Sequence, residues 1–479
     1  KIKITLFFLP KNCYTETIHI IILSFTYIFK EKPMLKKFFC ILTVFTLIFA
    51  SVAVPAYGYT PSTFEVDAEG ALLVNLDTGD KLYSKNTDRK LYPASLTKLM
   101  TALLLYESTT ELDSETVTVS ENAIKSLEGT DSSTGGLKIG EELTVRQMLY
   151  VLLLSSANDA ANAIAEHVSG SISEFVTLMN SKAAALGMSG THYANVHGLH
   201  DIDHYTTVND MYALTKAFLD VPLLKEISYS TKYKLEATNM SKERNYTTTN
   251  LLMLNNGQTC TAAKYKGQAY YYKYAKGVKT GYTDNAGRCL ISTATKNGYT
   301  YLCILMNSPV YDDIGNKIRI EFGDTKALYE WAFNEFEYKS VLQSGEIVSE
   351  VPVELSWDTD FVSAAPSADF STVIPKAADT STLGYNVKWY KESYDAPIKK
   401  GDVLGECDVT YGGEVLGTVT LVATQDISRN ILLYIGRGVG DFCKSVFGSA
   451  PFLIVLGLII AAIVIFIIVC IAMNSTRKK

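Results

Sequence analysis

The chain has 479 residues, of which 47% are apolar and 20% are charged, and its formal net charge is −6. Because this length exceeds what one domain usually needs, two folded domains are expected. The negative net charge offers no basic patch, which argues against nucleic acid as a partner.

An apolar run lies near the N-terminus. Met34 is followed by a short basic segment and then by an apolar stretch that ends in small residues at Ala56. This order is typical of a secretory signal peptide, so we expect 34–56 to be one and 1–33 to be upstream sequence read through in frame. The alternative is a genuine extension whose first membrane segment, around 20–29, is too short to span well.

A second apolar run, over 451–473, contains no charged residue. About 20 apolar residues suffice to span a bilayer. Because basic residues follow at 477–479, we expect an anchor in the cell membrane with the body of the chain outside the cytoplasm. Residues 427–448 interleave apolar and basic side chains, which predicts either a juxtamembrane amphipathic helix on the membrane surface or a plain linker helix.

Strand signals lie at both ends of residues 60–338, and helical patterns lie between them. Hairpins are expected over 71–84 and 289–306, the second with its turn at Asn297-Gly298. Helices are expected over 94–107, 144–154, 159–168, 172–186, 207–219 and 325–333. This order predicts an α+β domain in which one antiparallel sheet, built from both ends of the segment, packs against a helical block.

Short alternating runs separated by Gly-containing turns fill residues 340–425 and predict a small all-β domain.

Between the two apolar ends lie five cysteines, at positions 260, 289, 303, 407 and 443. Their spacing matches neither a disulfide framework nor a zinc site. Cys289 and Cys303 are expected to be small core residues, because both lie in apolar strand-like runs.

Ser95-Leu96-Thr97-Lys98 begins the first expected helix, where a step of three residues places Ser95 and Lys98 side by side. A serine hydroxyl is a poor nucleophile until a base takes its proton, and a half-buried lysine beside another cation can lose its own proton and act as that base. Backbone N–H groups at the helix start can also stabilise an oxyanion. Alone the motif is weak, because Ser-x-x-Lys occurs by chance in most long chains, and an exposed helix face is then the better explanation.

Ser156-Ala157-Asn158 interrupts two expected helices and places a hydroxyl and an amide on a tight loop, where both can relay protons for a lysine. Ser155 is an alternative to Ser156. The ordinary explanation is an N-cap for the helix that starts at Asp159, and Asn158 can serve both purposes.

Lys279-Thr280-Gly281 precedes Tyr282 in an expected strand. Gly281 lets a substrate chain lie against the strand edge. Lys279 supplies positive charge and Thr280 a hydroxyl suited to a carboxylate. A lysine at a strand end is the ordinary alternative.

The three motifs together are the signature of penicillin-binding proteins and class A β-lactamases, and here they occur in order, about 60 and 120 residues apart. The likeness extends over longer segments, at 92–102, 155–160, 195–199, 204–207, 277–283, 397–402 and 421–423. Over roughly 64–427 the sequence resembles the low-molecular-mass penicillin-binding proteins, the D-alanyl-D-alanine carboxypeptidases.

This resemblance implies a β-lactamase/transpeptidase-like catalytic domain, a C-terminal β-sandwich domain and no metal or cofactor. The implied activity is serine-type removal of the terminal D-alanine from peptidoglycan stem pentapeptides, with covalent binding of β-lactams. By the same resemblance Ser95 is acylated, Lys98 is the acylation base, and Ser156 and Asn158 complete the proton relay and hold the substrate amide.

The resemblance also implies the substrate-binding residues. Lys279 holds the second serine and places positive charge near the substrate carboxylate, Thr280 contacts that carboxylate, and Gly281 belongs to the same strand. The oxyanion hole is formed by the backbone N–H groups of the nucleophile and of Tyr282. Relatives often place a carboxylate-binding arginine before the last helix of the domain, and Arg319 is the candidate, although its spacing to the following tryptophan departs from the family pattern. A full transmembrane segment is a second departure, because many relatives end in an amphipathic helix.

Other functions remain as alternatives. A class A β-lactamase needs a deacylating glutamate after the second motif, and 175–225 contains none. A transpeptidase is usually longer, and an inactive peptidoglycan-binding scaffold on the same fold would not need every chemical position filled. Three histidines and two aspartates between positions 197 and 204 admit a metal cluster, but their spacing is not that of a zinc protease. Oligomeric state and stem-peptide preference stay open.

Overall fold

The structure is a computed structural model that describes residues 64–130, 132–447 and 450–476. The predicted signal peptide and the segment before it lie outside the described residues.

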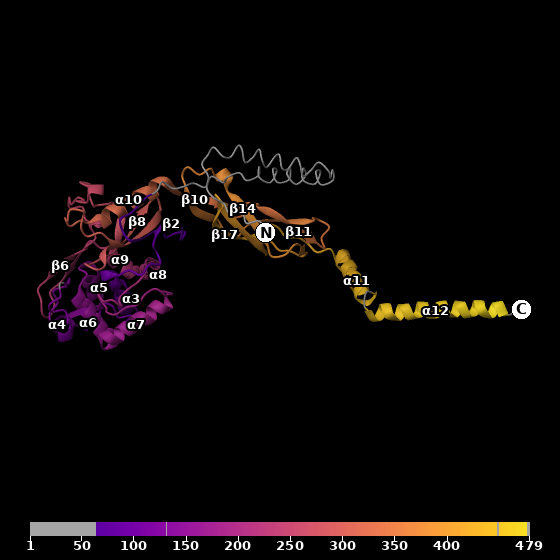
Figure 1. Ribbon diagram of the computed structural model, residues 1–479, viewed down its shortest axis with the longest axis horizontal. Coiled ribbons are helices and arrows are strands. Elements are labelled where there is room, and N and C mark those ends of the chain that lie inside the picture. Colours follow the sequence, from indigo (N-terminus) through magenta and orange to yellow (C-terminus); the bar gives the residue numbers. More distant parts are fainter. Residues whose placement is uncertain (1–63, 131, 448–449, 477–479) are drawn as a thin grey trace, which may run out of the picture. The chain divides into compact units, whose positions relative to one another are not determined.

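A five-stranded antiparallel sheet with the order β2-β1-β9-β8-β7 forms the centre of the first domain (Figure 1). Its strands are β1 (Gly70–Asn75), β2 (Lys81–Lys85), β7 (Ala275–Thr283), β8 (Gly287–Lys296) and β9 (Tyr299–Ser308). β1 pairs with β9 along its whole length, although more than 200 residues separate them. The predicted sheet built from both ends of the domain is therefore confirmed.

Alternate residues of these strands face two different cores, as the two-residue period of a strand requires. In β1, Leu72 and Val74 join the core on the side of the helical block, whereas Ala71 and Leu73 join the core beneath α10 (Ile320–Glu335). All four are fully buried. Cys289 and Cys303 are buried in these cores as expected.

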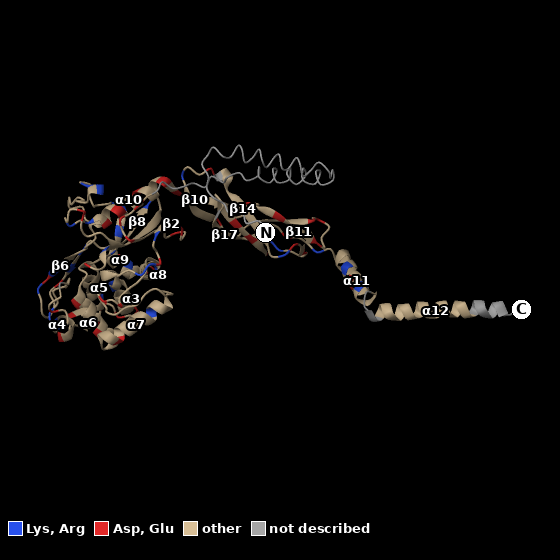
Figure 2. Cartoon of the chain, viewed as in Figure 1, with Lys and Arg blue, Asp and Glu red and all other residues tan. Residues whose placement is uncertain are grey.

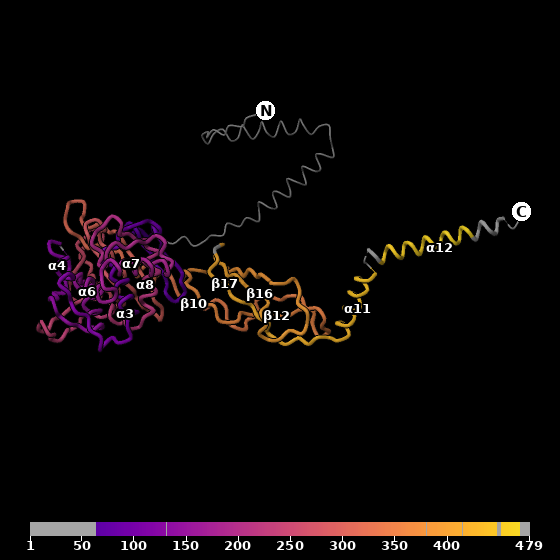
Figure 3. The backbone as a smooth tube through the Cα atoms, turned by 90° about the horizontal axis from the view of Figure 1, so that it is seen from below, coloured from indigo at the N-terminus to yellow at the C-terminus, as the bar shows by residue number. Residues whose placement is uncertain are grey.

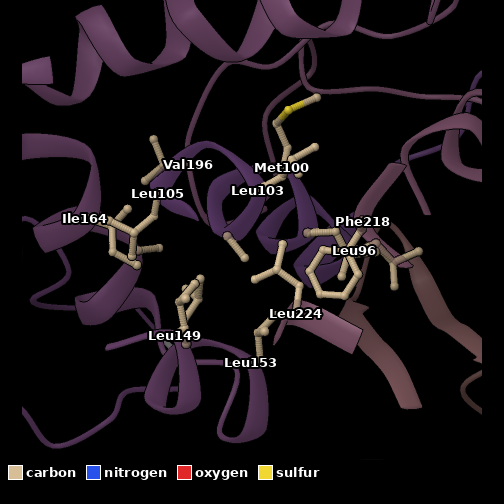
Figure 4. Close-up of a cluster of buried hydrophobic side chains, with 14 of the residues drawn as sticks. Leu96, Met100, Leu103, Leu105, Leu149, Leu153, Ile164, Val196, Phe218 and Leu224 are labelled. Carbon is tan, nitrogen blue, oxygen red and sulfur yellow. The ribbon is translucent and has the colours of Figure 1, made fainter. Parts of the chain in front are cut away.

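The helical block packs on one face of the sheet (Figure 1). Its helices are α3 (Lys98–Ser108), α4 (Glu121–Lys125), α5 (Val145–Leu154), α6 (Asn158–Ser169), α7 (Ile172–Ala185), α8 (Val208–Leu219) and α9 (Pro222–Tyr229). Helix α3 lies at its centre, and its Met100 and Leu103 belong to the same buried core as Leu149 of α5 and Phe218 of α8 (Figure 4). This burial fixes the helix that begins at Lys98.

The first predicted helix begins differently from expectation. Ala94–Thr97 forms a 3₁₀ turn, η1, and the α-helix starts only at Lys98. Because a 3₁₀ turn has three residues per turn, side chains three apart eclipse one another. The turn therefore aligns Ser95 with Lys98 more directly than an α-helix does.

Several elements were not predicted. Two-stranded antiparallel sheets pair β3 (Thr116–Thr118) with β4 (Glu142–Thr144) and β5 (Lys232–Leu235) with β6 (Arg244–Thr247). Single 3₁₀ turns, η2 (Leu251–Met253), η3 (Ala263–Tyr265) and η4 (Thr380–Thr382), lie in connections.

Helix α10 starts five residues before its predicted beginning at Thr325. Its first turn contains Gly323, which weakens the helical signal of the sequence. A Cβ at that position would lie 2.3 Å from the Tyr265 ring, so the glycine serves close packing.

The all-β domain holds a two-stranded and a six-stranded sheet, the latter with the order β14-β16-β17-β12-β11-β15 (Figure 3). Its strands are β10 (Phe336–Leu342), β11 (Ser349–Glu354), β12 (Phe361–Pro366), β13 (Phe370–Pro375), β14 (Gly384–Trp389), β15 (Tyr394–Asp395), β16 (Val403–Tyr411) and β17 (Glu414–Ala423). Its core includes Val351, Val362, Leu404 and Leu421. The predicted domain boundary at 338–340 falls inside β10, which pairs with β13.

Two helices follow the β domain. α11 (Ile431–Phe447) exposes apolar side chains such as Leu432 and Phe442 and has no buried residue. The sequence of α12 (Ala450–Thr476) contains no charged residue, and the part of the helix coloured in Figure 2 shows neither blue nor red. Its segment Phe452–Val469 is long and apolar enough to cross a membrane, with a mean hydropathy of 3.6.

Candidate active site

A pocket of about 870 Å³ brings the three motifs together. Ser95, Ser156, Asn158 and Thr280 line it, as do Gly281, Tyr282 and Arg319. The two motif lysines, Lys98 and Lys279, lie behind this surface, and their exposed fractions are 0% and 2%. Each predicted site residue is therefore in the pocket or bonded to a residue that lines it.

Lys98 is surrounded by three oxygen atoms. Its Nζ lies 3.0 Å from Ser95 Oγ, and it donates hydrogen bonds to Asn158 Oδ1 at 2.6 Å and to the His197 carbonyl at 2.7 Å. Asn158 is the first residue of α6, and its side chain binds this lysine instead of capping the helix. The alternative of an ordinary N-cap is therefore not what the structure shows.

Burial lowers the pKa of Lys98 well below its ordinary value, and the neighbouring charge of Lys279 lowers it further, while Asp159 opposes the shift. Desolvation disfavours the ammonium form, and a like charge adds to this effect. The arrangement therefore favours a neutral amine beside the serine hydroxyl.

The second motif meets the third through one hydrogen bond. Lys279 Nζ donates to Ser156 Oγ at 2.9 Å and to the Thr280 carbonyl at 2.9 Å, and burial lowers the pKa of Lys279 to about 7. Ser156 has a φ of 59°, a conformation that few non-glycine residues adopt. Ser155 donates instead to the Val151 carbonyl in α5. Of the two candidate serines, Ser156 is thus the one that faces Lys279.

Strand β7 lies directly against the 3₁₀ turn of the serine. A Cβ added to Gly281 would lie 3.1 Å from the Pro93 carbonyl oxygen and 3.2 Å from the Ser95 amide nitrogen. Only glycine fits this approach without displacing its neighbours. The strand brings the backbone of Tyr282 into the same pocket as Ser95.

Thr280 Oγ1 also lies 2.5 Å from the hydroxyl of Thr249, a pocket residue that no sequence motif indicated.

Two arginines and one glutamate line the pocket. Arg319 Nε donates to Glu321 Oε1 at 3.0 Å. Arg288, which the sequence did not single out, lies on β8 with its guanidinium 4.5 Å from the centre of the Tyr282 ring. Within the described residues, Arg288 Nε and Glu321 Oε2 are buried without a hydrogen-bond partner. Arg288 lies opposite Tyr282 in the β7–β8 register, and no sequence motif marked this residue.

Three histidines, which the sequence offered as part of a metal cluster, lie in different environments: His197, His200 and His204. Burial lowers the pKa of His197 to about 3 and that of His204 to about 4, so both are neutral near pH 7. His200 packs edge-on against the Tyr92 ring, 4.7 Å between ring centres. His197 and His200 line the pocket, whereas His204 bonds to Thr97 in the core.

Residues 57–310 match the family model described as D-alanyl-D-alanine carboxypeptidase, and residues 336–429 match the C-terminal domain of penicillin-binding protein 5. The chain belongs to the D-alanyl-D-alanine carboxypeptidase family. The resemblance inferred from the motifs is thereby confirmed, and the chain is a serine carboxypeptidase.

Known proteins resemble this carboxypeptidase over most of its length. D-alanyl-D-alanine carboxypeptidase DacF of Bacillus subtilis is 30% identical over 392 residues, which cover 81% of this chain and 93% of DacF. DacA of Escherichia coli K12 is 28% identical, over 77% of this chain and 85% of DacA. The crystal structure of penicillin binding protein 5 from Haemophilus influenzae superposes with a TM-score of 0.59 at 26% identity, over 78% of this chain and all of that one.

Proposed function

We propose that this carboxypeptidase removes the terminal D-alanine of a peptidoglycan stem pentapeptide through an acyl-enzyme on Ser95. The observation that carries the proposal is the set of three oxygens around Lys98. A neutral amine has two N–H bonds and one lone pair. If Asn158 Oδ1 and the His197 carbonyl accept the two N–H bonds, the lone pair faces Ser95 Oγ. Lys98 is then positioned to take the serine proton.

In the acylation step, Ser95 Oγ bonds to the carbonyl carbon of the penultimate D-alanine while its proton moves to Lys98 Nζ. The amide C–N bond then breaks. The leaving nitrogen receives a proton from Lys98 through the Ser156 hydroxyl, which Lys279 holds by its hydrogen bond. The second product is free D-alanine. The oxyanion that forms in between is stabilised by the backbone N–H groups of Ser95 and Tyr282.

In the deacylation step, a water oxygen bonds to the acyl carbon, and Lys98 takes the water proton. The bond to Ser95 Oγ breaks, and the proton returns to the serine, so that the enzyme regenerates. A β-lactam forms the same ester when its ring amide opens. Because the amine then stays attached to the acyl group, no leaving group departs, and the adduct hydrolyses slowly.

Incubation with a stem pentapeptide tests this function. We expect release of D-alanine and a tetrapeptide, without a cross-linked product. Cross-linked peptide would indicate a transpeptidase. Rapid turnover of penicillin without a lasting adduct would favour a β-lactamase.

The substrate carboxylate needs a cation near Thr280, and two arginines compete for this role. Arg319 Nε already donates to Glu321, whereas the Arg288 side chain, within the described residues, has no hydrogen bond or ion pair and lies over the Tyr282 ring in the pocket. We therefore propose that Arg288 contributes more to carboxylate binding than Arg319, the residue that family spacing indicated. A charge-assisted contact of this kind is worth about 1.5–3 kcal/mol.

Arg288→Gln is accordingly expected to raise KM for the pentapeptide by about 10- to 100-fold, and Arg319→Gln by less. The matched control is a pentapeptide with an amidated C-terminus, on which both variants should act like the unmodified enzyme. A larger KM effect at Arg319 would overturn the assignment.

We further propose that α12 anchors the chain in the cell membrane, with the catalytic domain outside the cytoplasm. The support is the length and composition of Phe452–Val469. Alkaline washing of membranes tests this anchor, because an integral segment resists the wash. Release of the intact chain into the supernatant would contradict it.

A further inference from the structure

His204 lies in the core, 2% exposed, and contacts the 3₁₀ turn η1 (Ala94–Thr97), which carries the nucleophile and is called the serine turn below. Its ring makes three hydrogen bonds. Nδ1 accepts from the backbone N–H of Ala194 at 3.0 Å and from that of Asn195 at 3.3 Å. Nε2 lies 2.7 Å from Thr97 Oγ1. A neutral imidazole carries one proton, and because Nδ1 accepts two N–H groups, that proton is on Nε2.

The direction of the remaining bonds follows from this tautomer. His204 Nε2–H donates to Thr97 Oγ1, and the Thr97 hydroxyl donates to the Ala94 carbonyl at 2.8 Å. Ala94 precedes the nucleophile and has a φ of 47°, which costs free energy for a residue with a side chain. The chain of bonds therefore ends on the strained residue that sets the backbone of the serine turn.

Through Nδ1, His204 binds the segment 194–198, and this segment also contacts the serine turn and the start of α3. Thr101 Oγ1 donates to the Val196 carbonyl at 2.6 Å, and the His197 carbonyl accepts from Lys98. Gly198 has a φ of 90°, and a Cβ there would lie 1.8 Å from the Ala94 carbonyl oxygen. The backbone that supplies one of the acceptors of Lys98 is thus fixed against the backbone of the serine.

We propose that His204 and Thr97 form a positioning pair, which holds the His197 carbonyl against Lys98 and thereby keeps the lone pair of Lys98 directed at Ser95. The inference rests on the proposed function, in which neutral Lys98 is the acylation base. Both residues are buried, and neither lines the pocket. The pair acts by fixing two backbone segments that are 100 residues apart in sequence.

Thr97→Val tests the pair, because it removes the hydroxyl and retains the branched shape. We expect the rate constant for acylation by a fluorescent penicillin to fall about 10- to 100-fold, the order of effect that misplacing a catalytic group produces. The dissociation constant of the initial penicillin complex should change less than about twofold, because the pocket surface is intact. Thr97→Ser, which restores the hydroxyl, should recover most of the acylation rate.

Thr215→Val is the matched control. Thr215 is fully buried in the same domain, and its hydroxyl donates to the Met211 carbonyl within α8. Thr97→Val removes two buried hydrogen bonds and Thr215→Val removes one, so acylation is compared at a temperature at which thermal unfolding shows both variants to be folded. Thr215→Val should acylate at the rate of the unmodified chain.

His204→Gln is a second, independent variant, because glutamine retains a donor for Thr97 but loses the Nδ1 acceptor. It should show the same slow acylation. Equal acylation rates for Thr97→Val, Thr215→Val and the unmodified chain would overturn the positioning pair and leave the proposed function intact. An absence of labelling in the unmodified chain would instead overturn the proposed function.

Discussion

Ser95→Ala is expected to lower the rate of D-alanine release from a stem pentapeptide by at least about 10⁴-fold, because the only nucleophile of the proposed reaction is removed. The same change should abolish labelling by fluorescent penicillin. The side chain is small and lies at the pocket surface, so folding should not suffer. Residual hydrolysis would come from the oxyanion hole and from substrate binding.

Ser155→Ala is the control for this experiment. Ser155 lies next to the second motif, but its hydroxyl donates to the Val151 carbonyl within α5. The variant should retain activity within about threefold of the unmodified enzyme, at the cost of one ordinary hydrogen bond. If Ser95→Ala retained labelling, or if Ser155→Ala lost it, the nucleophile would be elsewhere.

Lys98→Met is expected to slow acylation by about 10²- to 10⁴-fold, the contribution of a general base. Methionine has a similar length and fills the buried space, and it carries no polar group that would need hydrogen-bond partners there. Penicillin should still bind reversibly, because the pocket surface retains its residues. An acylation rate within tenfold of the unmodified chain would exclude Lys98 as the base.

The pH dependence of acylation gives the matched test. Because acylation needs neutral Lys98, the rate should rise with pH and reach its plateau once the lysine is deprotonated. The lowered pKa of Lys98 moves this rise well below the pH at which an ordinary lysine loses its proton. Lys279→Met removes the positive charge that helps to lower this pKa, so the rise should move to higher pH. A shift to lower pH would contradict the assigned roles.

Local patterns predicted the elements that carry the chemistry. The apolar period of the residues after Ser95 indicated the helix, and the hairpin signal at Asn297-Gly298 indicated the pairing of β8 with β9. The three-residue step from Ser95 to Lys98 correctly predicted their contact, because side-chain proximity within one turn is a local property.

Contacts between distant segments could not be read in the same way. The pairing of Thr97 with His204 and the position of Arg288 depend on how the sheet and the helices pack, and no local period encodes them. The early start of α10 at Ile320 was concealed by a glycine that serves tertiary packing. Arg319 was inferred from family spacing, yet in the folded chain its Nε is bonded to Glu321.

The most direct test of the central claim is to locate the covalent adduct. The full chain is incubated with a penicillin, digested and mapped by mass spectrometry. The account predicts one stoichiometric adduct, with the mass of the intact penicillin, on the peptide that contains Ser95. An adduct on a different serine, or a chain that remains unmodified after prolonged incubation at saturating penicillin, would contradict it.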